Sequence, residues 1–303
     1  MIFTLVKENL STHEAIDIIS RKTHTSIKRF GYFGNKDRNA VTAQRISVFK
    51  GNLNLFSKVY HPKLFLKDFY YSNKPCKIGD LYGNHFKIRI RNFDGDQDKL
   101  NEFIETAKKG LPNFYGPQRF GNNLINIQVS KAILDGDFKK AVDMLINNKK
   151  IIHQNSFEYK MKQYLEKLPN DYIGALRLIP KYLRLLILQS YQYNIYNKIL
   201  SECLKENIKP EKIPLIGYDL DLNELDTKLR EIFERIIKEE GIDIDNLNIR
   251  SMPEISMKSI YRDAFFIPED IQYNLDGKDL IMQFTLKRGS YASVFLIEML
   301  NSC

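Results

Sequence analysis

Hydrophobic and polar residues follow a strand-like spacing towards both ends of the chain and a helix-like spacing in its middle. Residues 2–6 form a short β-rich run and residues 41–50 alternate imperfectly, which predicts two strands. Residues 64–91 are again rich in strand-forming residues, with a break at Gly83 and clear alternation after it. Strands at such short separations favour an antiparallel or mixed sheet.

A helix is predicted between the first two strands. Ser11 and Glu14 form the pattern of a capping box, in which each side chain binds a backbone N–H of the first helical turn. Apolar residues continue at helical spacing, so the helix is expected from Thr12 to about Thr23. A second amphipathic helix is expected over residues 98–109. Strands combined with packed helices predict an α+β fold.

From residue 125 onwards the spacing of apolar residues becomes helical. Pro180 is expected at the first position of a long helix that ends near Lys205, because proline favours that position. Further helices are expected at residues 127–134, 138–147, 156–168 and 222–240. After Ile260 strands return, with a strand expected over residues 279–289 and a closing helix behind it.

This order of elements predicts one α+β domain that is interrupted by an insertion. The 303 residues have room for one large domain or two ordinary ones. Residues 1–124 and 262–303 are expected to form the two parts of the α+β domain. Residues 125–261 are expected to form a helix-rich insertion domain between them.

The composition is that of a globular protein with an anionic partner. Apolar residues make up 43% and charged residues 27%, which excludes disordered and fibrous classes. Lysine and arginine number 46 against 37 acidic residues, a net charge of +9 that favours nucleic acid as the partner. Three widely separated cysteines are typical of a reducing cytoplasm, where we expect the protein. No signal peptide or membrane-spanning run is recognised, so no membrane partner is expected.

Patterns that bind metals or cofactors are not found in the sequence. The five histidines do not fall at ligand spacing with each other or with a cysteine, so each is interpreted as a structural residue. Gly31 and Gly34 are too few for a dinucleotide fingerprint, and no Walker loop occurs. We therefore expect a site that works without a metal or a cofactor.

The most unusual polar stretch is GNKDRNAVTAQ at residues 34–44. It places one carboxylate, Asp37, between the cations Lys36 and Arg38. Such neighbours favour the ionised form, so Asp37 is a candidate for an anion held in a pocket. A solvated turn with all three charged groups in water explains the same pattern, and from charge alone it is the commoner arrangement.

The stretch at residues 34–44 resembles the signature G-x-K-D-x-x-A-x-T-x-Q of the TruD family of tRNA pseudouridine synthases. GDLYGNHF at residues 79–86 resembles that family's G-x-L-x-G-N-x-F stretch, and PNFYGPQRFG at residues 112–121 is similar to its P-N-Y-F-G-x-Q-R-F-G motif. Further similarities lie at residues 192–197, at Arg262 and at residues 289–293. Their order and spacing are also the family's, so the resemblance covers nearly the whole chain.

The resemblance implies a pseudouridine-synthase-like catalytic domain with a TRUD-type insertion, and a cofactor-free isomerase that acts on uridine in tRNA, typically U13. Asp37 matches the family's catalytic aspartate. Attack at C1′, addition to C6 and removal of the C2′ proton all remain open as its role. The implied partner is tRNA with its target uridine out of the base stack, and no protein partner is indicated.

Four further residues match positions that the resemblance assigns to the substrate site. Tyr115 stands where the family usually has phenylalanine, and its ring is expected to stack on the base, although core packing is the alternative. Asn113 is expected to bind the base edge. Lys36 and Arg119 are expected to meet phosphates or orient Asp37, with a structural role equally open for Arg119.

Two departures from the family pattern stand beside these matches. The family usually carries a segment with a lysine and a D-F-x-V-x-E strand before the first helix, and no counterpart is recognised here. Its closing helix usually reads L-R-E, whereas this chain has LIE at residues 296–298. The alternative function is therefore a non-catalytic RNA-binding protein on the same scaffold.

Overall fold

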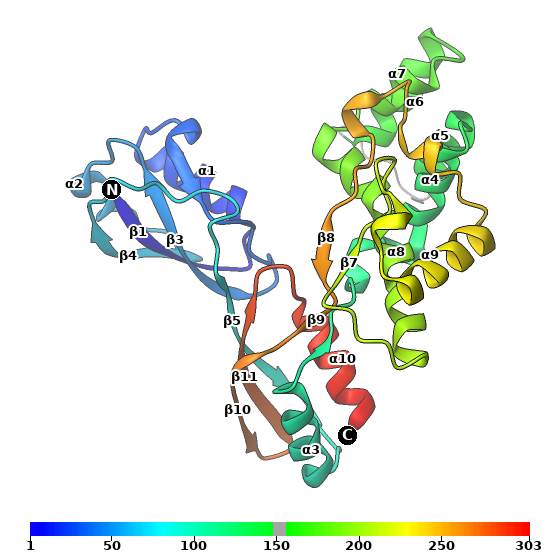
Figure 1. The fold of residues 1–303 in the computed structure, drawn as a ribbon. Helices are drawn as coiled ribbons and strands as arrows, with labels where there is room; N and C mark the ends of the chain where they lie inside the picture. Colours follow the sequence, from blue (N-terminus) through cyan, green and yellow to red (C-terminus); the bar gives the residue numbers. More distant parts are fainter. Residues whose placement is uncertain (148–155) are drawn as a thin grey trace. The chain divides into compact units, whose positions relative to one another are not determined.

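The fold was analysed in a computed structural model, which describes residues 1–147 and 156–303. The chain forms two compact units, residues 1–83 and 84–303, and each is described by itself (Figure 1). His153, which the sequence interprets as structural, lies outside the described residues. The predicted boundaries near residues 124 and 262 are not tested by this division and remain predictions.

The first unit is a four-stranded antiparallel sheet with one longer and one short α-helix. The strands lie in the order β2-β3-β1-β4. They are β1 (Ile2–Glu8), β2 (Phe30–Tyr32), β3 (Val41–Val48) and β4 (Leu64–Tyr70). Helix α1 (Thr12–Lys22) begins with the predicted capping box, because the Ser11 and Glu14 side chains each accept a backbone N–H of the other residue. A short helix, α2 (Leu53–Phe56), follows β3.

The core of this unit lies between α1 and the sheet. Phe3 and Leu5 on β1 are fully buried, and α1 adds the apolar side chains of Ala15, Ile16 and Ile19. Successive side chains of a strand point to opposite faces, so β1 presents every second residue to this core. The next residue of β1 on this face is Lys7, which is also buried.

The second unit contains a sheet in the order β10-β11-β5, with two helices packed on it (Figure 1). The strands are β5 (Gly83–Ile90), β10 (Glu269–Asp276) and β11 (Asp279–Lys287), and the helices are α3 (Gln97–Ala107) and α10 (Ala292–Ser302). The ring centroids of Phe284 on β11 and Phe295 on α10 lie 4.1 Å apart, and Phe103 on α3 packs against Phe295. Apolar burial thus joins segments that the middle of the chain separates.

Helices of the middle region share one apolar core, and α8 (Lys181–Lys205) is the longest helix of the described residues. The others are α4 (Ile125–Leu134), α5 (Phe138–Asn147), α6 (Phe157–Lys167), α7 (Tyr172–Arg177) and α9 (Thr227–Glu240). Two short strand pairs lie close to the points where the chain enters and leaves this region. They are β6 (Leu111–Pro112) with β9 (Phe265–Phe266), and β7 (Lys212–Pro214) with β8 (Tyr261–Asp263).

Two details of the predicted helices are wrong. Pro180 is the N-cap of α8 rather than its first helical residue, with an extended backbone. The predicted helix over residues 222–240 begins only at Thr227, because the Asp226 side chain caps that position. Residues Leu222–Glu224 form a separate 3₁₀ turn. Both errors concern helix starts, whose exact first residue is the least certain part of a prediction from sequence.

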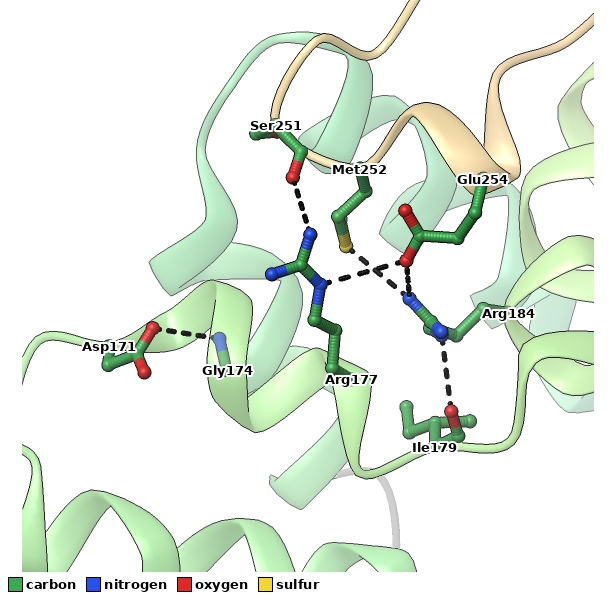
Figure 2. Close-up of polar contacts among 8 residues, drawn as sticks. All are labelled: Asp171, Gly174, Arg177, Ile179, Arg184, Ser251, Met252 and Glu254. Carbon is green, nitrogen blue, oxygen red and sulfur yellow. Dashed lines mark hydrogen bonds and ion pairs between the residues drawn. The ribbon is translucent and has the colours of Figure 1, made fainter.

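An ion-pair cluster ties the start of α8 to a distant loop (Figure 2). The Arg184 guanidinium donates to the Glu254 carboxylate at 2.7 Å and to the Ile179 carbonyl at 3.1 Å. Arg177 lies 3.6 Å from the same carboxylate and donates to the Ser251 carbonyl. The hydrogen bond from Arg184 holds the pKa of Glu254 below its ordinary value.

Replacing Glu254 with glutamine is expected to destabilise the protein in a pH-dependent way. A pKa that is lowered in the folded state contributes stability above the ordinary value of 4.5 and loses it as pH falls through the lowered value. The melting temperature of Glu254→Gln should therefore lie below that of wild type at pH 7, and the two should converge in acid. A difference that stays constant from neutral to acidic pH would contradict the assignment.

Candidate functional site

Asp37 lies on a loop that joins β2 to β3 in the first unit. Both ends of the loop are held by the sheet, since Tyr32 pairs with Ile46 and Val41 pairs with Glu8. The Asp37 side chain is exposed. Among the described residues, no hydrogen bond or ion pair ends on its carboxylate. The carboxylate is therefore available to a ligand from solution.

A buried lysine holds the backbone of this loop. Lys7 on β1 is only 1% exposed, and its ammonium donates to the Asp37 carbonyl oxygen at 2.8 Å. Burial lowers the pKa of Lys7, although the negative charges of Asp37 and Glu14 act in the opposite direction. Burying a cation is costly unless polar groups compensate it, so the position of Lys7 calls for a functional explanation.

Helix α1 fastens the same loop from its N-terminal end. The Thr12 hydroxyl accepts the backbone N–H of Lys36 at 2.9 Å and the Gln44 side-chain amide at 3.1 Å. Arg38 pairs with Glu14 at 3.1 Å, so the capping residue of α1 also holds the loop. The two cations that flank Asp37 in the sequence have different environments. Burial lowers the pKa of Lys36, whereas Arg38 forms an ion pair with Glu14 of α1.

Tyr115 lies in the second unit, at the centre of a group of aromatic and cationic side chains. Its ring stacks on Tyr193 of α8 with centroids 3.8 Å apart, and the Arg262 guanidinium carbon lies 4.1 Å from its centroid. Two groups at these distances cannot share one face of a ring, so they cover opposite faces. Tyr115 is 8% exposed, and burial raises the pKa of its hydroxyl well above the ordinary value. That hydroxyl therefore remains protonated at neutral pH.

Asn113 has its side chain engaged by neighbouring protein groups. Its amide nitrogen donates to the Asp263 carbonyl at 2.9 Å, and its amide oxygen accepts from Arg262 at 2.6 Å. Arg262 also donates to the Asn113 carbonyl through two nitrogens, at 3.1 and 3.2 Å. Asn113 thus fixes the guanidinium that covers Tyr115. The arrangement supports a positioning role for Asn113 more directly than a contact with a base.

Asn197 and Arg119 complete this group of residues. The Asn197 amide on α8 accepts the backbone N–H of Tyr115 at 2.8 Å and donates to its carbonyl at 3.0 Å, in the manner of a neighbouring strand. Arg119 donates to the Tyr291 hydroxyl at 2.9 Å, and its guanidinium lies 5.5 Å from the centroid of that ring. The loop that carries Tyr115 is therefore fixed on both sides.

The predicted site residues form two clusters in this structure. Asp37 and Lys36 lie on one loop of the first unit, whereas Asn113, Tyr115 and Arg119 belong to the aromatic cluster of the second unit. Sequence reasoning missed Lys7, although a lysine at a core position of β1 was a usable signal. It noted Arg262 and residues 192–197 only as matches, without a role for either.

The positive charge of the chain is concentrated in the first unit. Residues 1–83 contain 14 lysines and arginines and six acidic residues, so they carry +8 of the total charge of +9. Residues 84–303 are therefore almost neutral. Basic residues occur throughout both units, but in residues 84–303 they are balanced by almost as many acidic residues.

Two features are absent from the described part of the chain. In that part, no group of three or more histidine, cysteine or acidic side chains has an arrangement that could hold a metal ion. None of its helices combines the length and the apolar character that crossing a membrane requires. The three cysteines are free thiols, and Cys76 and Cys203 are buried.

Comparisons with known proteins agree on one family. The family model described as tRNA pseudouridine synthase D (TruD) matches residues 1–154, 148–213 and 210–299. Two curated relatives carry the name probable tRNA pseudouridine synthase D. The one from Nanoarchaeum equitans is 29% identical, over 97% of this chain and 85% of that protein. The one from Methanosarcina mazei is 26% identical, over 99% and 87%.

A solved structure supports the same assignment. The crystal structure titled putative tRNA pseudouridine synthase D (TruD) from Methanosarcina mazei has a TM-score of 0.78 and 26% identity to this chain. It covers 99% of this chain, and this chain covers 87% of it. The predicted α+β pseudouridine-synthase fold is thereby confirmed. Because the family model spans both clusters, the chain belongs to the TruD family of tRNA pseudouridine synthases, which are isomerases.

Proposed function

We propose that this protein converts uridine to pseudouridine in tRNA, at position U13, with Asp37 as the catalytic carboxylate. The observation that carries the proposal is the exposed Asp37 side chain on a loop whose backbone is held by Lys7 and Thr12. A carboxylate on a fixed backbone meets the substrate at little cost in conformational entropy. A cytoplasmic location fits this substrate and remains a prediction.

The reaction is an isomerisation that needs no external reactant. The N1–C1′ bond breaks, the base turns, a C5–C1′ bond forms, and the proton leaving C5 is balanced by the one gained at N1. Asp37 can serve this sequence as a nucleophile at C1′, as a nucleophile at C6 or as a base at C2′. Each of these roles requires an ionised carboxylate in contact with the nucleoside.

The RNA backbone is proposed to be held mainly by the first unit. Its net charge of +8 attracts phosphates over a distance of about a Debye length, and Lys36 lies beside Asp37 on the same loop. In this assignment, the uneven charge brings the nucleic acid to the unit that carries the catalytic carboxylate.

The aromatic cluster of the second unit is proposed to bind the substrate through Tyr115 and Arg262. Protein groups cover both faces of the Tyr115 ring, so a base can stack on it only if one neighbour moves. Arg262 is the group proposed to move, since a guanidinium that leaves a ring can pair with a phosphate. Arg119 is proposed to hold Tyr291 in place, and Asn113 to guide Arg262.

Asp37→Asn tests the catalytic assignment, because asparagine preserves the shape of the side chain and removes its charge. We expect pseudouridine formation on unmodified tRNA to fall at least about a hundredfold, as for loss of an acid–base or nucleophilic group. The affinity for tRNA should remain close to that of wild type. Chemical mapping of pseudouridine gives the activity and its position, and a filter-binding assay gives the affinity.

A matched control for this test is Asp68→Asn, another exposed aspartate of the first unit. It should keep full activity. An Asp37→Asn protein as active as wild type would remove Asp37 from its role. A wild-type protein that binds tRNA and forms no pseudouridine would favour the non-catalytic alternative.

Lys7→Met tests whether the buried lysine positions the loop. We expect turnover at saturating tRNA to fall about tenfold, equivalent to ~1.4 kcal/mol, because the Asp37 backbone loses its anchor. The melting temperature should be unchanged or higher, since methionine avoids the cost of burying a charge. Lys58→Met, at an exposed lysine, is the control and should change neither quantity. A parallel loss of activity and stability would indicate a purely structural lysine.

Tyr115 offers a test that separates its ring from its hydroxyl. Tyr115→Phe should keep activity within about twofold, because burial keeps the hydroxyl protonated and stacking needs only the ring. Tyr115→Leu fills a similar volume without a π face, and it should lower kcat/KM by roughly tenfold or more, within the range for one lost base stack. Circular dichroism verifies folding. Equal activity of the leucine variant would exclude base stacking on Tyr115.

A further inference from the structure

The first unit contains a pocket that none of the groups assigned above occupies. Its volume is about 690 Å³, which is within the size range of ligand sites. It is lined by residues that precede and begin β2, by the end of β3 and the two residues after it, by residues 71–75, and by Met1 and Ile2. We call it the basic pocket.

The charges of the basic pocket all have one sign. Its lining includes Lys28, Arg29, Lys50 and Lys74 and no acidic side chain. Arg29 donates to the Phe49 carbonyl at 2.8 Å and to the Lys50 carbonyl at 2.6 Å, which fixes that side of the rim. Among the residues that the structure describes, none of these four cations has an ion-pair partner, so together they raise the local concentration of an anionic ligand.

Two exposed aromatic rings lie in the same lining. Phe49 and Tyr71 are each 69% exposed, and the Lys50 ammonium lies 5.5 Å from the centroid of the Phe49 ring. Aromatic rings beside cations form the arrangement by which proteins hold unstacked bases and their phosphates together. An acidic peptide would use the cations and leave the rings without a partner.

The basic pocket lies at the opposite end of β3 from the Asp37 loop. The loop enters β3 at Val41, and the pocket is lined by residues from Ser47 onwards. Seven steps along a strand at about 3.4 Å each separate Val41 from Val48 by about 24 Å. One bound nucleoside cannot reach both places, whereas one RNA molecule can.

We propose that the basic pocket binds a second nucleotide of the RNA substrate, remote from the target uridine, with its base against Phe49 or Tyr71 and its phosphate between Lys28 and Lys74. The choice of RNA as the anion rests on the proposed function. The site adds affinity for the RNA without entering the chemistry at Asp37. It therefore acts on KM and leaves kcat unchanged.

Two double variants test the two halves of this site by direct binding of unmodified tRNA. Phe49→Ala with Tyr71→Ala removes the rings without a change of charge, and it should weaken binding about tenfold at every salt concentration. Lys28→Gln with Lys74→Gln should weaken binding in low salt. It should also reduce the slope of log Kd against log salt by roughly two, about one for each lost phosphate contact.

Matched controls come from exposed residues of the same unit outside the pocket. Tyr60→Ala with Phe65→Ala should leave the affinity for tRNA unchanged. Lys58→Gln with Lys63→Gln makes the same change in charge as the pocket variant, and it should reduce the salt slope by clearly less. If this lysine control matches the pocket variant, the field of the whole unit explains the binding and the proposal is wrong.

The remaining outcomes are also decisive. Wild-type affinity of the Phe49 and Tyr71 variant would show that the pocket holds no base. A lowered kcat at saturating tRNA in either pocket variant would contradict a site remote from the chemistry. The affinity for tRNA is measured without turnover, so it tests the pocket independently of catalysis. If the proposed function is wrong, neither the wild-type protein nor any variant forms pseudouridine. If only the pocket proposal is wrong, the protein forms pseudouridine and the pocket variants bind tRNA as the wild type does.

Discussion

The hydrogen bond from the Lys7 ammonium to the Asp37 carbonyl is the constraint on which the proposed active-site loop depends. It joins an inner strand of the sheet in the first unit to the loop whose carboxylate is proposed to do the chemistry. This hydrogen bond requires a positive charge to be buried, which costs free energy of folding. The alternating pattern of β1 would otherwise place an apolar residue at position 7. Thr12 and the pair between Glu14 and Arg38 add anchors from α1. Protein groups thus hold the backbone and leave the side chain exposed.

The second unit uses the same device with other residues. Asn197 binds both backbone groups of Tyr115, and Asn113 holds the guanidinium that covers the Tyr115 ring. Polar side chains here replace a regular strand neighbour, so an irregular loop is fixed without being part of a sheet. Asn113 and Arg262 lie on opposite sides of the helix-rich middle region in the sequence. Their contact therefore forms only when the segment after that region packs against the segment before it.

Much of the fold and part of the site could be predicted from the sequence. The capping box of α1 and the antiparallel strands were readable because they depend on residues close together. The family motifs made Asp37 and the loop of Tyr115 candidates for the site, and their roles remain predictions. The role of Lys7 was not readable, because its partner is a backbone atom thirty residues away that no side-chain pattern reveals. The covering of Tyr115 by Arg262 likewise joins residues that only the folded chain brings together.

The uneven charge of the two units has a consequence for the kinetics of RNA binding. Long-range attraction governs how fast a charged ligand arrives, whereas close packing and stacking govern how long it stays. Residues 1–83 carry nearly all the net charge, so salt and substitutions there act first on the association rate. The nearly neutral residues 84–303 offer rings and hydrogen bonds, so their contribution falls on the lifetime of the complex. Under these proposals, capture of the substrate depends mainly on residues 1–83, whereas its retention draws on aromatic rings of both units.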